Sequence, residues 1–116
     1  AKSPFAADDA FVDASLDDVA TPLARCYANR AIEYDDPELV VLAKRWNFND
    51  SEVLRCGREL ADKRQLAGEM ALDAGDIEVA FWDWSAALRA DPSRAWLRRR
   101  TEELRDERFR LAGKGK

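Results

Sequence analysis

The 34 residues from 61 to 94 constrain the fold of this chain more than any other part of the sequence. Small residues, a turn, an aromatic residue and a stop follow one another there at fixed offsets: Gly68, Gly75-Asp76, Ala80, Trp84, Ala87 and Asp91-Pro92. Ala80, Trp84 and Ala87 are spaced by four and three residues, so they share one helical face. Small residues let two helices approach closely, and the indole ring fills the remaining space. The block therefore predicts two antiparallel helices joined at Gly75-Asp76, with Pro92 ending the second.

This arrangement resembles the tetratricopeptide repeat family, whose repeat has a small residue on its first helix, a Gly-Asp turn, an Ala-x3-aromatic-x2-Ala pattern and a closing Pro. The resemblance covers residues 61–94 and implies one helix–turn–helix unit. Arg64 and Ala71 depart from it, because the family usually has larger aromatic residues at both positions. A single unit cannot bury its own apolar faces, and the preceding 34 residues hold no second clear copy. Flanking helices are therefore expected to cover it.

The region before this block is expected to be helical as well. Asp36-Pro37-Glu38 is a typical helix start, because Asp can cap, Pro fits the first helical position and Glu favours the dipole. This helix should reach about Arg45. The segment Trp46-Asn47-Phe48 is then expected to be a loop whose rings fold onto the core. The polar run Asn49-Asp50-Ser51 offers the next cap.

Three longer helices should follow, at about 52–74, 77–90 and 94–111. Gly75 is expected to end the first of them in the left-handed conformation, and Asp76 can cap the second. The last should fray in a tail at 113–116. At the other end of the chain, an apolar series recurs at intervals of three and four residues and predicts an amphipathic helix: Val12, Leu16, Val19 and Leu23. Pro22 marks a kink or a second start in it.

These elements add up to five or six helices, no strand and one domain. The domain comprises an acidic amphipathic segment (1–20), a helical region (21–60), the repeat-like hairpin (61–94) and a charged capping helix with its tail (95–116). We expect an all-α fold: a small antiparallel helical array with one tetratricopeptide-like helix pair and a C-terminal capping helix.

The sequence offers no candidate set for catalysis. It has no His among its 116 residues, and it contains no G-x-S-x-G or H-E-x-x-H motif. Cys26 and Cys56 are too few for a zinc site. Buried, reduced thiols are the favoured interpretation over a disulfide, although both stay open. The chain is therefore expected to be neither an enzyme nor a cofactor or metal carrier.

The two ends carry opposite charge. Residues 1–20 hold five Asp and one Lys, whereas residues 94–116 hold nine basic and four acidic side chains. Arg98, Arg99 and Arg100 form the densest basic run, but Glu102 and Glu103 follow Arg98 and Arg99 by four residues and offset part of it. The whole basic cluster of this end comprises Arg94, Arg98, Arg99, Arg100, Arg105, Arg108 and Arg110. For this cluster we rank a solvated capping face first, a protein contact second and nucleic acid third.

Further partner contacts are predicted within the hairpin. Trp82 and Trp84 lie about 160° apart around one helix, so one ring should leave the hairpin core. Trp82 is then expected to meet another helix of the chain or a partner. If the family resemblance holds, the concave groove that it implies is lined by an acidic row: Asp62, Gln65, Glu69 and Asp73.

Together these features predict a non-catalytic protein-protein interaction module, such as an accessory, scaffold or assembly subunit of a larger complex. The alternative is a nucleic-acid-associated factor that binds through its Arg-rich last helix. The longest apolar run, Leu39 to Ala43, is too short to span a bilayer, which leaves association with a membrane complex open. The chain begins at Ala1 without Met, as expected of a processed or trimmed form, so its compartment is open.

Overall fold

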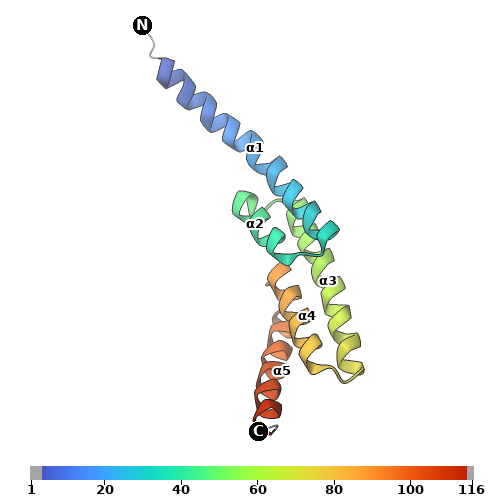
Figure 1. Ribbon diagram of the computed structural model, residues 1–116. Coiled ribbons are helices and arrows are strands. Elements are labelled where there is room, and N and C mark those ends of the chain that lie inside the picture. Colours follow the sequence, from blue (N-terminus) through green and yellow to red (C-terminus); the bar gives the residue numbers. More distant parts are fainter. Residues whose placement is uncertain (1–3, 115–116) are drawn as a thin grey trace.

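The computed structural model describes the backbone of residues 4–114 and the side chains of residues 18–113. Within that range the chain forms helices and no strand: α1 (Pro4–Tyr34), α2 (Pro37–Asn47), α3 (Ser51–Asp73), α4 (Ile77–Ala90) and α5 (Ala95–Lys114). Consecutive helices run antiparallel, and the two ends of the chain lie at opposite ends of an elongated molecule (Figure 1). The predicted all-α antiparallel array is confirmed.

Local capping sets where most of the helices begin. The carboxylate of Asp50 accepts hydrogen bonds from the backbone N–H groups of Glu52 and Val53, and Asp76 accepts one from Val79. Asp36 likewise accepts from Glu38 at the start of α2. Each cap satisfies an N–H group that the first turn of a helix leaves without an intrahelical partner. Gly75, at φ +82°, takes the left-handed conformation between α3 and α4, as predicted.

The hairpin of α3 and α4 packs through the residues that the sequence pattern singles out. Gly68, Ala80, Trp84 and Ala87 are all buried. The indole of Trp84 lies against the bare backbone of Gly68, and its Nε1 donates a hydrogen bond to the carbonyl of Gln65 at 3.0 Å. Helix α4 ends at Ala90, two residues before Pro92. The predicted close approach of these two helices is therefore present.

Small residues carry the packing of α1 as well. Ala24, Ala28 and Ala31 are fully buried in the core, while Val19 is 52% exposed. The helix continues through Pro22 without a second start. The predicted apolar series is therefore not the face that α1 turns to the core in the described part of the helix. Val12, Leu16 and the aspartates of residues 8–17 lie outside the described side chains. Of the tail expected at 113–116, Gly113 and Lys114 instead belong to α5, and Gly115 and Lys116 lie outside the described residues.

The segment predicted to be a loop belongs largely to α2, and that prediction is wrong. Trp46 and Asn47 are helical, and the rings of Trp46 and Phe48 are 42% and 74% exposed rather than folded onto the core. Helix α2 turns Val40 and Ala43 inward, and Trp46 lies about 120° around the helix from Val40. The amide of Asn47 donates to Thr21 Oγ1 of α1 at 3.0 Å and fixes this orientation.

Arg64 of α3 joins the α3–α4 hairpin to the first hairpin, which α1 and α2 form. Its guanidinium donates to the side chain and the backbone carbonyl of Asp35, in the α1–α2 turn, at 3.0 and 2.9 Å, and to Asp83 of α4 at 3.1 Å. The α1–α2 turn thus lies level with Arg64, whereas the α3–α4 turn lies at Gly75. At the helical rise of 1.5 Å per residue, α3 and α4 extend about 16 Å beyond the first hairpin. Figure 1 shows this stagger, which contributes to overall dimensions of 77 × 25 × 22 Å.

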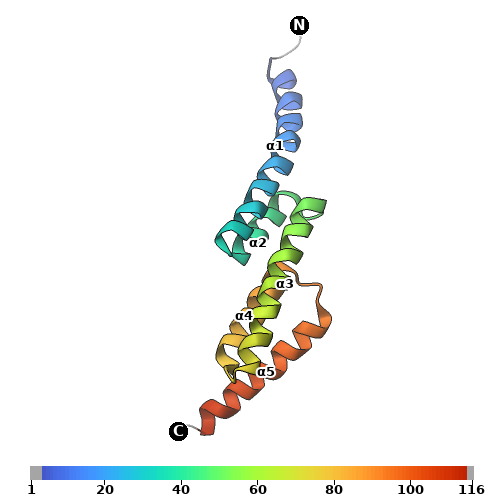
Figure 2. The same ribbon diagram turned by 90° about the vertical axis from the view of Figure 1, so that its right-hand side faces the viewer.

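Helix α5 covers one side of the α3–α4 hairpin. The connection after α4 swings outward, and α5 then runs obliquely along the hairpin (Figure 2). Leu97, Thr101 and Leu104, spaced by four and three residues, are the buried residues of α5 as far as its side chains are described, to Gly113. The hydroxyl of Thr101 donates to the carbonyl of Leu97 and so needs no partner elsewhere. The opposite face of α5 is charged and exposed, as expected of a capping helix.

Candidate binding surfaces

The acidic row predicted on α3 is present but partly covered. Arg94, in the connection before α5, donates to Asp62 Oδ1 at 2.6 Å and to Gln65 Oε1 at 2.8 Å. Gln65 in turn donates to Glu69 at 3.4 Å. Asp73, at the end of the row, is exposed. Arg94 therefore closes the first half of the row, and the carboxylates near the α3–α4 turn stay accessible.

Trp82 is the tryptophan that leaves the core. Its side chain is 59% exposed, whereas Trp84 is 1% exposed, which confirms that one of the two rings points outward. Trp82 Nε1 donates to Glu78 Oε1 at 2.9 Å, and its ring meets Phe81 edge-on with the centroids 5.2 Å apart. The guanidinium of Arg108 lies 5.4 Å from the centroid of Trp82 and 4.3 Å from that of Phe81. The exposed ring is thus held in place by α4 and α5.

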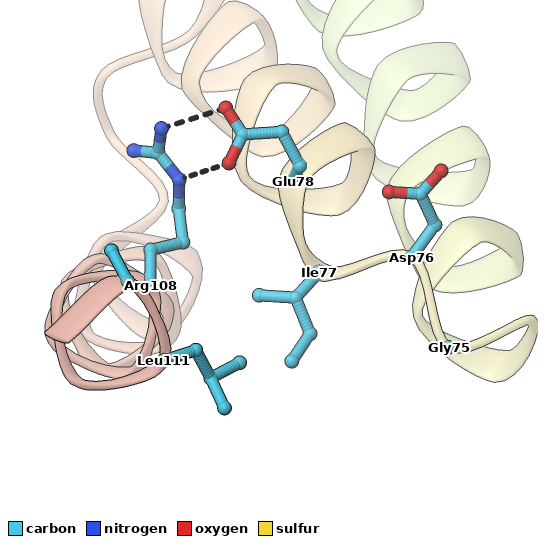
Figure 3. A pocket seen from close by; sticks show the side chains of 7 residues that line it. Gly75, Asp76, Ile77, Glu78, Arg108 and Leu111 are labelled. Carbon is cyan, nitrogen blue, oxygen red and sulfur yellow. Dashed lines mark hydrogen bonds and ion pairs between the residues drawn. The ribbon is translucent and has the colours of Figure 1, made fainter. Parts of the chain in front are cut away.

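A hollow of about 460 Å³ lies where α5 passes the α3–α4 turn. Figure 3 shows Arg108 of α5 reaching Glu78 of α4, with Ile77 and Leu111 beside them. Both hydrogen bonds of this pair measure 2.7 Å. Hydrogen bonding to Arg108 lowers the pKa of the Glu78 carboxyl, so the pair stays ionised at neutral pH. Glu78 and Arg108 thus bind each other across the hollow, and Asp76, which also lines it, accepts the capping hydrogen bond from Val79.

The basic cluster of residues 94–110 is largely engaged within the chain. Of the seven arginines between residues 94 and 110, five lie within 4.0 Å of a carboxylate oxygen: Arg94, Arg100, Arg105, Arg108 and Arg110. Arg98 instead donates to the carbonyl of Pro92 at 2.6 Å, and Glu103 pairs with Arg100 rather than with Arg99. The expected offset of the charge is present, but through different pairs.

Within residues 18–113, whose side chains are described, no group of three or more His, Cys, Asp or Glu residues is placed to hold a metal ion. None of the helices, as far as the structure describes them, is long and apolar enough to cross a membrane.

Neither cysteine forms a disulfide, and the two differ in environment. Cys56 is buried between α1 and α3, where its Sγ lies 3.9 Å from Asn29 Oδ1, and burial raises the pKa of its thiol. Cys26 is exposed, so the prediction of two buried thiols is wrong for that residue. The reason is that α1 buries its alanines instead, and Cys26 falls between Ala24 and Ala28 on another side of the helix.

This difference predicts unequal reactivity of the two thiols. In the native protein at neutral pH, a thiol reagent should modify Cys26 about 100-fold faster or more than Cys56, because Cys56 is both shielded and less often ionised. The rates of Cys26→Ser and Cys56→Ser, measured by the absorbance of the released chromophore, assign each reaction. Equal rates in the two variants would contradict the buried position of Cys56, and in denaturant the rates should converge.

Comparison with known proteins adds no relative. No family model, curated protein or solved structure matches this chain.

Several exposed apolar side chains were not recognised as exposed from the sequence. Leu66 and Met70 of α3 are 58% and 64% exposed, and Val79 of α4 is 46% exposed. Gly57 was likewise missed: a Cβ there would lie 2.7 Å from the carbonyl oxygen of Ala90, so this glycine permits a second close contact of α3 with the end of α4. The sequence does not show which helix faces the neighbouring helices cover. It therefore could not distinguish these residues from core residues.

Proposed function

We propose that this chain is a non-catalytic protein-protein interaction module, acting as an accessory, scaffold or assembly subunit of a larger complex. The observation that carries the proposal is the exposed indole of Trp82, held at the surface by Glu78, Phe81 and Arg108. A large ring that is already ordered loses little conformational freedom on binding, and Trp is enriched at the energetic centres of protein interfaces.

The hairpin of α3 and α4 is part of this proposal as a tetratricopeptide-like unit. Its support is the contact of Trp84 with Gly68, the burial of Ala80 and Ala87 and the left-handed Gly75. Arg64 takes a different role from the aromatic residue usual in the family, because it binds Asp35 of the preceding turn. A nucleic-acid partner is less well supported, since most arginines of the last helix already face carboxylates.

Affinity purification tests the proposal. The immobilised chain should retain one or more specific proteins from an extract of its native source, and Trp82→Ala should retain them at least about tenfold less. Trp96→Ala is the matched control, because Trp96 is also exposed, at 54%, but lies on α5. Far-UV circular dichroism should be the same for both variants. A chain that retains nothing above an unrelated control protein would sink the proposal.

A further inference from the structure

One side of the α3–α4 hairpin packs against α1 and α2, but they cover only part of its length. On α3, Cys56, Leu60, Lys63, Ala67 and Met70 recur at intervals of four and three residues and form one row. Its upper part is covered by the first hairpin: Cys56 and Leu60 are buried. At the level of Lys63 the α1–α2 turn ends, with Asp35 Oδ2 at 3.5 Å from Lys63 Nζ. Beyond it, Met70 is 64% exposed.

A matching row on α4 is likewise buried at one end and exposed at the other. Ala90, Ala86, Asp83 and Val79 recur at intervals of four, three and four residues. Ala90 is buried, Ala86 lines a hollow with Pro37 at the start of α2, and Asp83 binds Arg64. Val79, one turn further, is 46% exposed. We call the bare lower part of this side the step surface and define it by Ala67, Met70, Val79 and Trp82.

The step surface has the form of a helix-packing face. Two rows with spacing of three and four residues are the ridges against which a helix packs, and the same rows hold the first hairpin one level higher. The stagger leaves about 16 Å of hairpin beyond the α1–α2 turn, which is the length of a helix of about 11 residues. The hollow between Pro37, Trp82 and Ala86 lies at the upper end of this surface and can receive one apolar side chain.

The charge around the step surface selects the kind of partner. Residues 65–88 contain five acidic side chains and no basic one: Glu69, Asp73, Asp76, Glu78 and Asp83. Asp83 and Glu78 are neutralised by Arg64 and Arg108. Glu69, Asp73 and Asp76 have no cationic side chain within ion-pair distance among the described residues. The edge of the step surface near the α3–α4 turn is therefore negative, which favours a positively charged partner.

We infer that the step surface binds a short amphipathic helix of a partner protein, with large apolar residues on the face that meets Met70, Val79 and Trp82 and with Lys or Arg along its edges. This inference rests on the proposed function and names the surface and the partner chemistry for it. The bound helix would continue the packing that α1 and α2 make above it, and its cations would face the carboxylates near the α3–α4 turn.

A pair of model peptides tests the inference. One is a helical peptide of about 15 residues, with Leu along one face and Lys at the edges, and the other has every Lys replaced by Glu. Binding to the full chain is measured by the fluorescence anisotropy of a labelled peptide. The Lys peptide should bind saturably and more weakly as salt is raised, and the Glu peptide should bind at least about tenfold less tightly.

Two double variants locate the binding. Met70→Lys with Val79→Lys should weaken binding of the Lys peptide at least about tenfold, because both changes place cations in the apolar contact. Val19→Lys with Phe109→Lys is the matched control, since it adds the same charge at two exposed apolar side chains elsewhere and should change affinity less than about threefold. Both variants should keep the circular dichroism of the original chain.

Several outcomes overturn the inference. They are equal affinity for the Lys and Glu peptides, no saturable binding of the Lys peptide, equal effects of the two double variants, and self-association that only Met70→Lys with Val79→Lys abolishes. The last would assign the step surface to a second copy of the chain. If a native partner is still retained by this variant, the inference fails while the proposed function stands.

Discussion

Replacing Trp84 with alanine is expected to remove about 3–5 kcal/mol from the free energy of unfolding. The ring is 1% exposed, contacts the backbone of Gly68 and lies 6.3 Å from the ring of Trp96, centroid to centroid. Truncation leaves a cavity between α3 and α4 and removes the hydrogen bond to the carbonyl of Gln65. Because domains of this size are stable by only about 5–15 kcal/mol, the variant should be close to unfolding.

Urea denaturation followed by far-UV circular dichroism measures this loss without relying on tryptophan fluorescence. Trp82→Ala is the control on the same helix, because it removes an identical side chain that is 59% exposed. It should cost less than about 1 kcal/mol, since surface substitutions outside buried networks have small effects. Similar losses in the two variants would mean that Trp82 and Trp84 do not occupy opposite faces of α4.

The starts of α2, α3 and α4 were predictable because capping is local. Asp36, Asp50 and Asp76 each bond to N–H groups two or three residues further along, so the signal lies within a few letters of the sequence. The left-handed turn at Gly75 is local in the same sense, since its backbone conformation favours glycine. These features do not depend on which helix packs against which.

The orientation of the first hairpin was not predictable, because its core is built from small residues. Sequence reasoning gives weight to large apolar side chains and so placed Trp46 and Phe48 in the core. The structure instead buries Ala24, Ala28 and Ala43 completely and leaves those rings exposed. Alanine contributes little apolar area, and its value here is the close approach of helix axes, which becomes apparent only once the neighbouring helix is in place.

Of the candidate surfaces, too, the part that follows from local geometry could be predicted, and the part that depends on long-range contacts could not. Trp82 could be predicted because its angle to Trp84 follows from helical geometry alone. The step surface could not, since Met70 and Val79 are exposed only because the α1–α2 turn ends at Arg64. That contact joins residues 29 positions apart, and Arg94 covers the acidic row of α3 through contacts of similar range. Long-range ion pairs decide which of the predicted faces remain open.

Replacing Gly68 with alanine is expected to cost about 2 kcal/mol of stability, despite the higher helix propensity of alanine. A Cβ at this position would lie 2.3 Å from Trp84 Cδ1 and 2.4 Å from Trp84 Nε1, well inside the contact distance of about 3.5–4.0 Å. Overpacking of this kind costs about 1–3 kcal/mol, and displacement of the ring also endangers its hydrogen bond, worth about 0.5–1.5 kcal/mol. The gain in propensity, about 1 kcal/mol, offsets only part of this loss.

Chemical denaturation of three further variants separates the steric term from the propensity term. Gly113→Ala is the matched control, because Gly113 is also helical but has no atom within 4 Å of an added Cβ, and it should not lose stability. In the background of Trp84→Leu, Gly68→Ala should cost nothing further, since the shorter side chain makes room for the methyl group. An undiminished cost in that background would place the origin of the effect elsewhere than in the contact between Gly68 and Trp84. The two substitutions are therefore expected to be strongly non-additive, as required if this one contact sets the distance between α3 and α4.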